Sequence, residues 1–186
     1  MALADRLDAL PPTIDLGHQS TMTFLRNDPY LTRVRVAPLT DHETLYVPPH
    51  WHETHDELFR IVKGRMRVLI GTEWKTYVPE DGEVLIPRRT VHSLQCFQGE
   101  ETIFDERTEP MDPGKEIFFR NFLVTGRVPT NFLYVMVVSY NGDMRPSLPG
   151  GIKWLESWLV TILGGYIAPL LGYKIKYDSE FFKESL

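Results

Sequence analysis

The part of the chain that decides the fold reads PPHWHETHDELFRIVKG over residues 48–64. His50 and His52 are separated by one residue, so on a strand both side chains point to the same face, about 6–7 Å apart at the backbone. Two imidazoles placed in this way can bind one metal ion through bonds of about 2.0–2.1 Å. The polar residues 53–56 give the chain room to turn, and Glu57 then opens the next apolar run. The stretch predicts a metal site built from two histidines and a carboxylate.

A third histidine follows farther along the chain. Residues 79–82 (PEDG) are a strong turn signal, and His92 comes after this turn and after Pro87, on a predicted strand that can face the same interior. Three neutral imidazoles and one carboxylate suit a divalent transition metal and leave one or two positions open for water or substrate. The residue pattern therefore predicts a single metal ion held by His50, His52, Glu57 and His92.

Short strands surround these histidines. In 65–70 the apolar residues Met66, Val68 and Ile70 alternate with arginines, and Gly64 precedes them, which predicts an antiparallel hairpin with a glycine turn. Further runs of strand character occupy 31–36, 43–47, 57–63, 84–87, 91–97 and 102–104. Strands that recur every 8–12 residues with turn signals between them predict a β-sandwich or β-barrel.

The spacing of the first motif resembles that of the cupin family. In that family a His-x-His is followed by three or four residues, a Glu, six residues and a Gly. Here His50-Trp51-His52 is followed by four residues, Glu57, six residues and Gly64, so the motif matches in full.

The second cupin motif matches in part. Pro87 and His92 stand where the family has them, whereas Gly82 lies one residue too close to Pro87. Arg89 replaces the middle glycine and Cys96 replaces the asparagine. These departures affect the geometry of the turn and leave the ligand itself in place.

The resemblance implies a mostly β chain with a single cupin-type antiparallel β-barrel (jelly-roll) over residues 31–108. It implies His50, His52, Glu57 and His92 as metal ligands inside the barrel. The remaining chain is expected to form an N-terminal arm (1–30) and a C-terminal α-helical extension (109–186). The short distance between the two motifs is similar to that in small single-barrel cupins.

The extension is rich in aromatic residues. We expect helices over 116–124 and 131–140 and a helix in two pieces over 146–173, where Gly164-Gly165 and Pro169 interrupt the apolar run. The helices either form a lid over an apolar pocket or cover the sheet and make a homodimer surface. The aromatic residues considered for this role are Phe118, Phe119, Phe122, Phe132, Tyr134 and Trp154. Residues 157–173 carry no formal charge and could instead contact a membrane.

Composition narrows the class of partner and the compartment. The chain has 186 residues and a net charge of −5, with no run of Lys or Arg, which argues against nucleic acid as a partner. Its single cysteine, Cys96, excludes an internal disulfide and is compatible with a reducing compartment. The charged start of the chain does not resemble a secretory signal, so we expect a cytoplasmic protein.

Three further residues are candidates for a catalytic role. Tyr46 precedes the histidine motif and could place a hydroxyl near the metal. His55 lies between the ligands, either as an acid–base or supporting group or in a solvated loop. Cys96 shares a face with His92 by strand parity and either lines the pocket or acts as a small hydrophobic core residue.

Fold alone does not decide the chemistry of such a site. The first hypothesis is an Fe(II) dioxygenase or oxidoreductase of secondary metabolism acting on a small, largely apolar molecule. The alternative is a Zn, Mn or Ni enzyme that acts without redox change as an isomerase, decarboxylase, dehydratase or cyclase on a carbonyl or polyketide-like substrate. A further alternative is a cupin that binds a small ligand without catalysis. We expect a homo-oligomer in each case.

Overall fold

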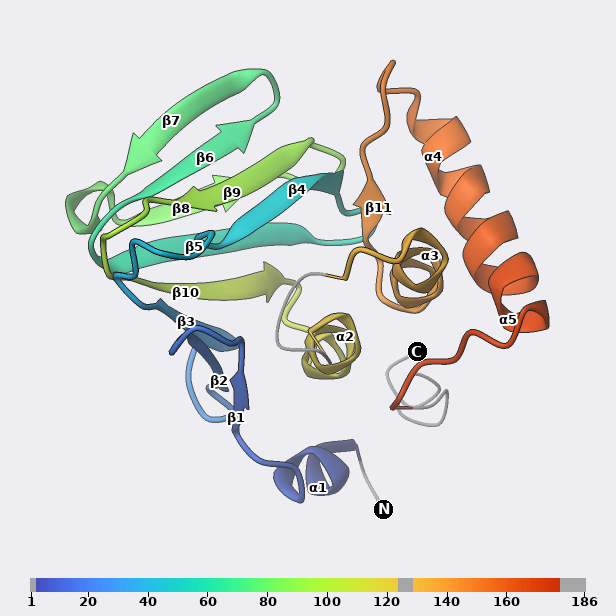
Figure 1. Cartoon of the computed structure of the whole chain (residues 1–186), viewed down its shortest axis with the longest axis horizontal. Coiled ribbons are helices and arrows are strands. Elements are labelled where there is room, and N and C mark those ends of the chain that lie inside the picture. The colour runs from blue at the N-terminus through green and yellow to red at the C-terminus, as the bar shows by residue number, and fades with distance from the viewer. Residues whose placement is uncertain (1–2, 124–128, 178–186) are drawn as a thin grey trace.

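A computed structural model of the chain describes residues 3–123 and 129–177. Two antiparallel sheets face each other, and the helices of the C-terminal part lie at one end of them (Figure 1). The six-stranded sheet has the order β1-β2-β3-β10-β5-β8 and the five-stranded sheet the order β11-β4-β9-β6-β7. The expected mostly β fold is confirmed. The sheets remain two separate layers rather than one closed barrel, an arrangement compatible with a jelly-roll.

The first sheet contains β1 (Thr13–Asp15), β2 (Thr21–Phe24), β3 (Thr32–Val36), β5 (Asp56–Lys63), β8 (Glu83–Ile86) and β10 (Thr102–Glu109). The second contains β4 (Tyr46–Trp51), β6 (Met66–Ile70), β7 (Glu73–Tyr77), β9 (His92–Cys96) and β11 (Arg145–Pro146). The helices are α1 (Leu3–Asp8), α2 (Lys115–Phe122), α3 (Phe132–Asn141), α4 (Lys153–Leu159), the π-helical segment η2 (Val160–Ile167) and α5 (Ala168–Leu170), and a 3₁₀ turn η1 spans Pro79–Asp81. Helix 116–124 is confirmed up to Phe122, and Val124 lies outside the described residues.

The core lies between the two sheets. Strand β3 alternates buried and half-buried residues, as expected for a strand with one face inward. Phe59, Met66 and Phe104 are fully buried there, and Phe59 meets the ring of Tyr77 edge-to-face at 5.5 Å between centroids. The strands that carry the site residues are therefore held in place by a closely packed interior.

Gly64 is not the turn of a hairpin, contrary to the prediction. It joins β5 in one sheet to β6 in the other, and these two strands do not pair. Its φ is +76°, and a Cβ at this position would lie 2.2 Å from the carbonyl oxygen of Glu101. A glycine is needed because the chain must cross between the layers in close contact with another backbone segment.

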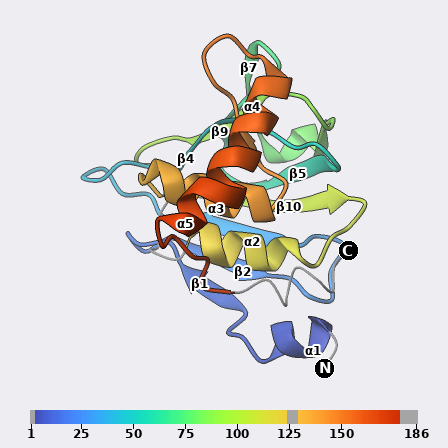
Figure 2. The same ribbon diagram turned by 90° about the vertical axis from the view of Figure 1, so that its right-hand side faces the viewer.

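The C-terminal helix is also continuous where a break was expected. Segments α4, η2 and α5 follow one another with helical backbone at each junction, as Figure 2 shows. A Cβ at Gly164 would lie 2.1 Å from the carbonyl oxygen of Met136, so this glycine lets the helix pack closely on α3 rather than ending it. In the described ranges 3–123 and 129–177, no helix has the length and apolar character required to cross a bilayer.

Two of the contacts between the extension and the sheets lie on β4. Strand β11 pairs with β4, with Arg145 opposite Trp51 and Pro146 opposite His50. The buried indole of Trp51 donates a hydrogen bond to Glu156 Oε2 at 2.7 Å. The helices therefore dock directly on the strand that carries the first histidine.

Candidate metal centre and its cavity

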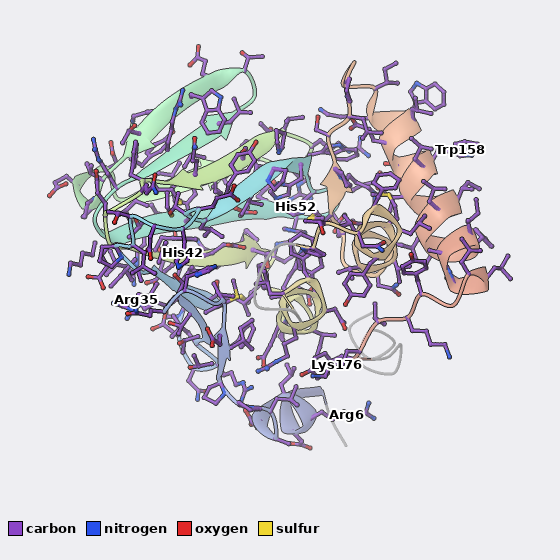
Figure 3. All side chains as sticks on the ribbon, in the orientation of Figure 1. Arg6, Arg35, His42, His52, Trp158 and Lys176 are labelled. Atoms are coloured by element: carbon purple, nitrogen blue, oxygen red, sulfur yellow. The ribbon has the colours of Figure 1, made fainter. Side chains whose placement is uncertain are left out.

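The structure brings the four predicted ligands together. His50 lies near the end of β4 opposite His92 at the start of β9, His52 follows β4, and Glu57 lies at the start of β5. One ligand atom from each of the four residues lies within 4.8 Å of the others. All four side chains belong to residues that are at most 7% exposed. Figure 3 shows the labelled His52 at the end of the sheets that faces the helices.

A bulge in β4 aims His50 inward. The register of β4 with β9 shifts between Val47 and His50, where Pro48 and Pro49 interrupt the ladder. Proline has no backbone donor, so in sheets it is confined to bulges and edges. The pair of prolines thus sets the approach to the first ligand.

Each histidine is held by a backbone carbonyl on its outer nitrogen. The Nδ1 atoms donate to Pro48 O at 2.8 Å (from His50), Asp143 O at 2.6 Å (from His52) and Thr90 O at 3.0 Å (from His92). Because a carbonyl can only accept, each Nδ1 carries its hydrogen. The three Nε2 atoms are left as the inward-facing, potential metal-binding atoms, which is the usual arrangement of metal-ligating histidines.

The charges in the cluster fit a cation. Glu57 Oε2 lies 3.1 Å from His52 Nε2 and 3.3 Å from His92 Nε2. The His92 contact lacks hydrogen-bond geometry, and this buried nitrogen has no hydrogen-bond partner in the described part of the chain. Lone pairs and a carboxylate that converge in this way repel one another unless a proton or a metal ion lies between them. The donor set is the one that a divalent transition metal prefers.

The pKa values follow from burial and mutual contact. Burial lowers the pKa of His50 well below its usual range and that of His52 to about 4. Burial acts in the same direction on His92, but the charge of Glu57 outweighs it and raises the pKa of His92. Burial would raise the pKa of Glu57, yet His92 and His52 hold it well below the usual range. A bound metal would displace a proton from the His92–Glu57 pair, so metal and protons compete for this centre.

Asp143 organises the loop between the ligands. Its carboxylate accepts hydrogen bonds from Glu53 N at 3.0 Å, Thr54 N at 2.9 Å and Thr54 Oγ1 at 2.5 Å, and it lies 2.9 Å from His55 Nδ1. These donors hold the pKa of Asp143 far below its usual range although burial opposes them. Its backbone carbonyl also holds His52. No sequence motif marked Asp143, which has a φ of 45° in the turn after α3.

His55 lies in the site rather than in a solvated loop. It is buried, stacks on His52 with 4.4 Å between ring centroids, and lines the adjoining cavity. Its Nδ1 faces Asp143, and its Nε2 makes no hydrogen bond to any residue that the structure describes.

The other two catalytic candidates lie away from the cluster. Tyr46 is exposed at the far end of β4 and is not among the residues that line the cavity. Cys96 is buried on the same strand as His92, but it belongs to the hydrophobic core, and burial raises the pKa of its thiol to about 12. Cys96 is therefore a protonated core residue with low reactivity.

An apolar cavity opens beside the cluster and encloses about 710 Å³ of empty space, counting its mouth. Helix α2 forms one wall with Phe118, Phe119 and Phe122. Phe132 and Trp154 are exposed on other helices, and Tyr134 does not line the cavity either. Among the residues that the structure describes, the lining comprises Leu16, Met22, Val34, Leu45, Val47, His50, His52, His55, Glu57, Leu94, Phe104, Glu106, Lys115, Phe118, Phe119, Phe122, Leu123 and Met144.

Two ionisable residues in this lining were missed by sequence reasoning. Lys115 begins α2, and burial lowers its pKa. Glu106 lies on β10, and burial together with the charge of Glu57 raises its pKa well above the usual range. The alternation of β10 could have placed Glu106 inward with Phe104, whereas nothing in the local sequence marks Lys115.

No family model matches the chain. Relatives in fungi are named oxidoreductases. "Probable oxidoreductase patJ" of Aspergillus clavatus is 24% identical over 159 residues, which cover 77% of this chain and 47% of that protein. An oxidoreductase of Arthrobotrys oligospora is 28% identical over 146 residues, which cover 68% of this chain and 56% of that protein. The chain spans about half the length of these curated relatives.

Solved structures similar to this chain include cupin-domain proteins. KdgF from Halomonas is 21% identical with a TM-score of 0.39, and the match covers 50% of this chain and 82% of that one. A cupin-2 domain protein from Rhodospirillum rubrum is 21% identical with a TM-score of 0.38, and the match covers 52% of this chain and 60% of that one. Proteins described as cupins are thus among the structural neighbours of this chain.

Proposed function

We propose that this chain is a metal-dependent cupin enzyme, an Fe(II)-type dioxygenase or oxidoreductase of secondary metabolism that acts on a small, largely apolar molecule. The observation that carries the proposal is the buried cluster of three imidazoles and one carboxylate at the wall of an apolar cavity. The fungal relatives are named oxidoreductases, which supports the proposal of an oxidative reaction.

His50, His52, Glu57 and His92 would hold the ion. Bound Fe(II) would supply open coordination positions for dioxygen and substrate. The chain contributes the rest. Backbone carbonyls fix the orientation of the imidazoles, and the aromatic wall of α2 keeps the substrate beside the cluster and excludes water.

The second candidate is a non-redox enzyme with Zn, Mn or Ni at the same four residues. Two ionisable groups in the cavity, Glu106 and Lys115, favour it, because isomerases, dehydratases, decarboxylases and cyclases move protons. A cupin that only binds a small ligand is the remaining alternative.

Reconstitution with different metals separates these functions. The chain is stripped with chelator, loaded with Fe(II) or Zn(II) without air, and supplied with a panel of aromatic and polyketide-like carbonyl compounds in an oxygen-electrode cell. Oxygen uptake that depends on both substrate and iron is expected. Turnover of substrate with Zn(II) in the absence of oxygen would replace the dioxygenase proposal with the non-redox one.

We also propose that the protein is a cytoplasmic homo-oligomer. The C-terminal helix leaves large apolar side chains exposed, and Trp158 points away from the rest of the molecule in Figure 3. The exposed residues are Trp154, Trp158, Tyr166, Ile167, Leu170 and Leu171. Light scattering on the protein as it leaves a size-exclusion column is expected to give a molecular mass that is a multiple of the chain mass of 21.6 kDa. A monomer that floats with lipid vesicles would instead favour membrane contact through residues 157–173.

A further inference from the structure

Lys115 is a buried cation on the wall of the cavity. The residue is 4% exposed, and its Nζ donates a hydrogen bond to Gly142 O at 3.0 Å. The same nitrogen lies 4.8 Å from the centroid of the Phe118 ring. An ammonium group has three donors, and in the part of the chain that the structure describes the carbonyl and the ring that it contacts are both uncharged. Burial of a charge is costly unless the charge is paired.

The acidic groups that face Lys115 are otherwise engaged. Asp143, Glu57, Glu106 and Asp112 all act on it electrostatically, but across residues 3–123 and 129–177 none of them forms an ion pair with it. Asp143 accepts the bonds of the ligand loop, and Glu57 belongs to the metal cluster. Asp112 accepts a hydrogen bond from Gly114 N at 2.8 Å.

Glu106 does not neutralise Lys115 either. Within the described part of the molecule its side chain forms neither a hydrogen bond nor an ion pair with Lys115, whose Nζ donates to Gly142 O instead. Apart from this carboxyl, the ammonium, His55 and the candidate metal ligands, the described part of the cavity lining is apolar. A few polar groups in an apolar cavity are the usual means by which a ligand is oriented.

We propose that Lys115 binds a carboxylate carried by the substrate, so that the natural substrate is an apolar carboxylic acid held beside the metal cluster. The proposal rests on the proposed function in that it uses the same cavity, but it does not depend on which metal is bound. The carboxylate would supply the direct ion-pair partner that Lys115 lacks among the described residues, and the apolar body would pack on the aromatic wall formed by α2.

The test compares benzoate with acetophenone, which have similar shapes but differ in charge. Their dissociation constants are measured by NMR titration of the full chain loaded with Zn(II). Wild-type protein should bind benzoate about tenfold more tightly or better, as a charge-assisted hydrogen bond in a buried site implies. Lys115→Met should abolish this preference, and Lys115→Arg should largely keep it. Lys153→Met, at an exposed lysine outside the cavity, is the matched control and should behave as wild type.

Further measurements distinguish a binding role of Lys115 from a structural role and from binding of the carboxylate by the metal. Thermal unfolding and metal content are measured for each variant, and Lys115→Gln is used if Lys115→Met does not fold. A purely structural Lys115 would change stability but not the preference for benzoate over acetophenone. Equal binding of the two probes to wild type, failure of benzoate to bind, or a preference that survives in Lys115→Met would overturn the proposal. If removal of the metal abolished the preference for benzoate over acetophenone while Lys115→Met kept it, the metal ion and not Lys115 would be the group that binds the carboxylate. A chain that binds no metal yet shows the Lys115-dependent preference would contradict the proposed function and leave this proposal standing.

Discussion

The segment around the histidine motif and the C-terminal extension contribute to the same centre in different ways. Residues 50–64 and His92 supply the candidate ligands, and their local spacing predicted that role. The extension supplies Asp143, which orders the loop between the ligands, and Lys115, which lies in the cavity wall. The comparison indicates that the strands and the adjoining loop provide the donor atoms, whereas the extension holds His52 and the loop between the ligands and forms part of the cavity wall.

The largest expected effect comes from the strands. His92→Ala removes one of the four donors and should lower the affinity for Zn(II) or Fe(II) by more than about 100-fold, since loss of an outer partner alone typically costs about 10–100-fold. Competition with a chromophoric chelator measures this metal affinity. Gln95→Ala, on the same strand but not in the cavity lining, is the control and should retain wild-type affinity. Equal affinities in the two variants would exclude His92 as a ligand.

The docking of the extension should have the next largest effect. Glu156→Ala leaves the buried indole N–H of Trp51 and the backbone N–H of Leu148 without their acceptor, and each unsatisfied donor costs about 1–3 kcal/mol when buried. We expect the free energy of unfolding to fall by about 2 kcal/mol in urea titrations. Glu156→Gln keeps an acceptor and should recover part of the loss. Wild-type stability in Glu156→Ala would show that this contact does not hold the extension to β4.

A smaller effect is expected when the loop between the ligands is less well ordered but all four candidate ligands remain. Asp143→Asn keeps the backbone carbonyl that holds His52 but weakens the bonds to residues 53–55. We expect metal affinity to fall about tenfold. Asp105→Asn is the matched control, because Asp105 is also buried but lies between Arg33 and Arg60 in the sheet. If both variants changed the affinity equally, the role assigned to Asp143 would be wrong.

The smallest expected effect is on the pH dependence of the free energy of unfolding, and it concerns Asp105, the residue replaced in the control variant Asp105→Asn. Arg33 and Arg60 hold the pKa of Asp105 below its unfolded value of 3.8, although burial opposes them. A depressed pKa contributes stability that is present above pH 3.8 and is lost as the pH falls through the folded pKa. Because the arginines are almost half exposed, we expect a difference of about 1 kcal/mol between wild type and Asp105→Asn at neutral pH. This difference should shrink in urea titrations below pH 3.8, and a constant difference would contradict the assignment.

Local patterns predicted the strands and the candidate cluster because both depend on short-range geometry. The spacing of His50, His52 and Glu57 follows from strand parity and one turn, and β3 and β6 alternate as the sequence indicates. Gly64 was misread because a glycine turn looks the same whether it returns the chain within a sheet or passes it to the other layer.

Long-range contacts escaped prediction. Asp143 follows the ligand loop by about 90 residues, and no local pattern indicates that its carboxylate meets Glu53 N and Thr54 N. Gly164 was taken as a helix breaker, whereas its role depends on the close approach of Met136. Helix packing decided both positions, and single-sequence periodicity does not report helix packing.

The most direct test of the account is the metal content of the purified full chain, measured by elemental mass spectrometry after dialysis. The account predicts one divalent transition-metal ion per chain in the wild type and loss of that ion when His52 and Glu57 are both replaced by alanine. Metal at background level in the wild type, or equal content in the double variant, would contradict it.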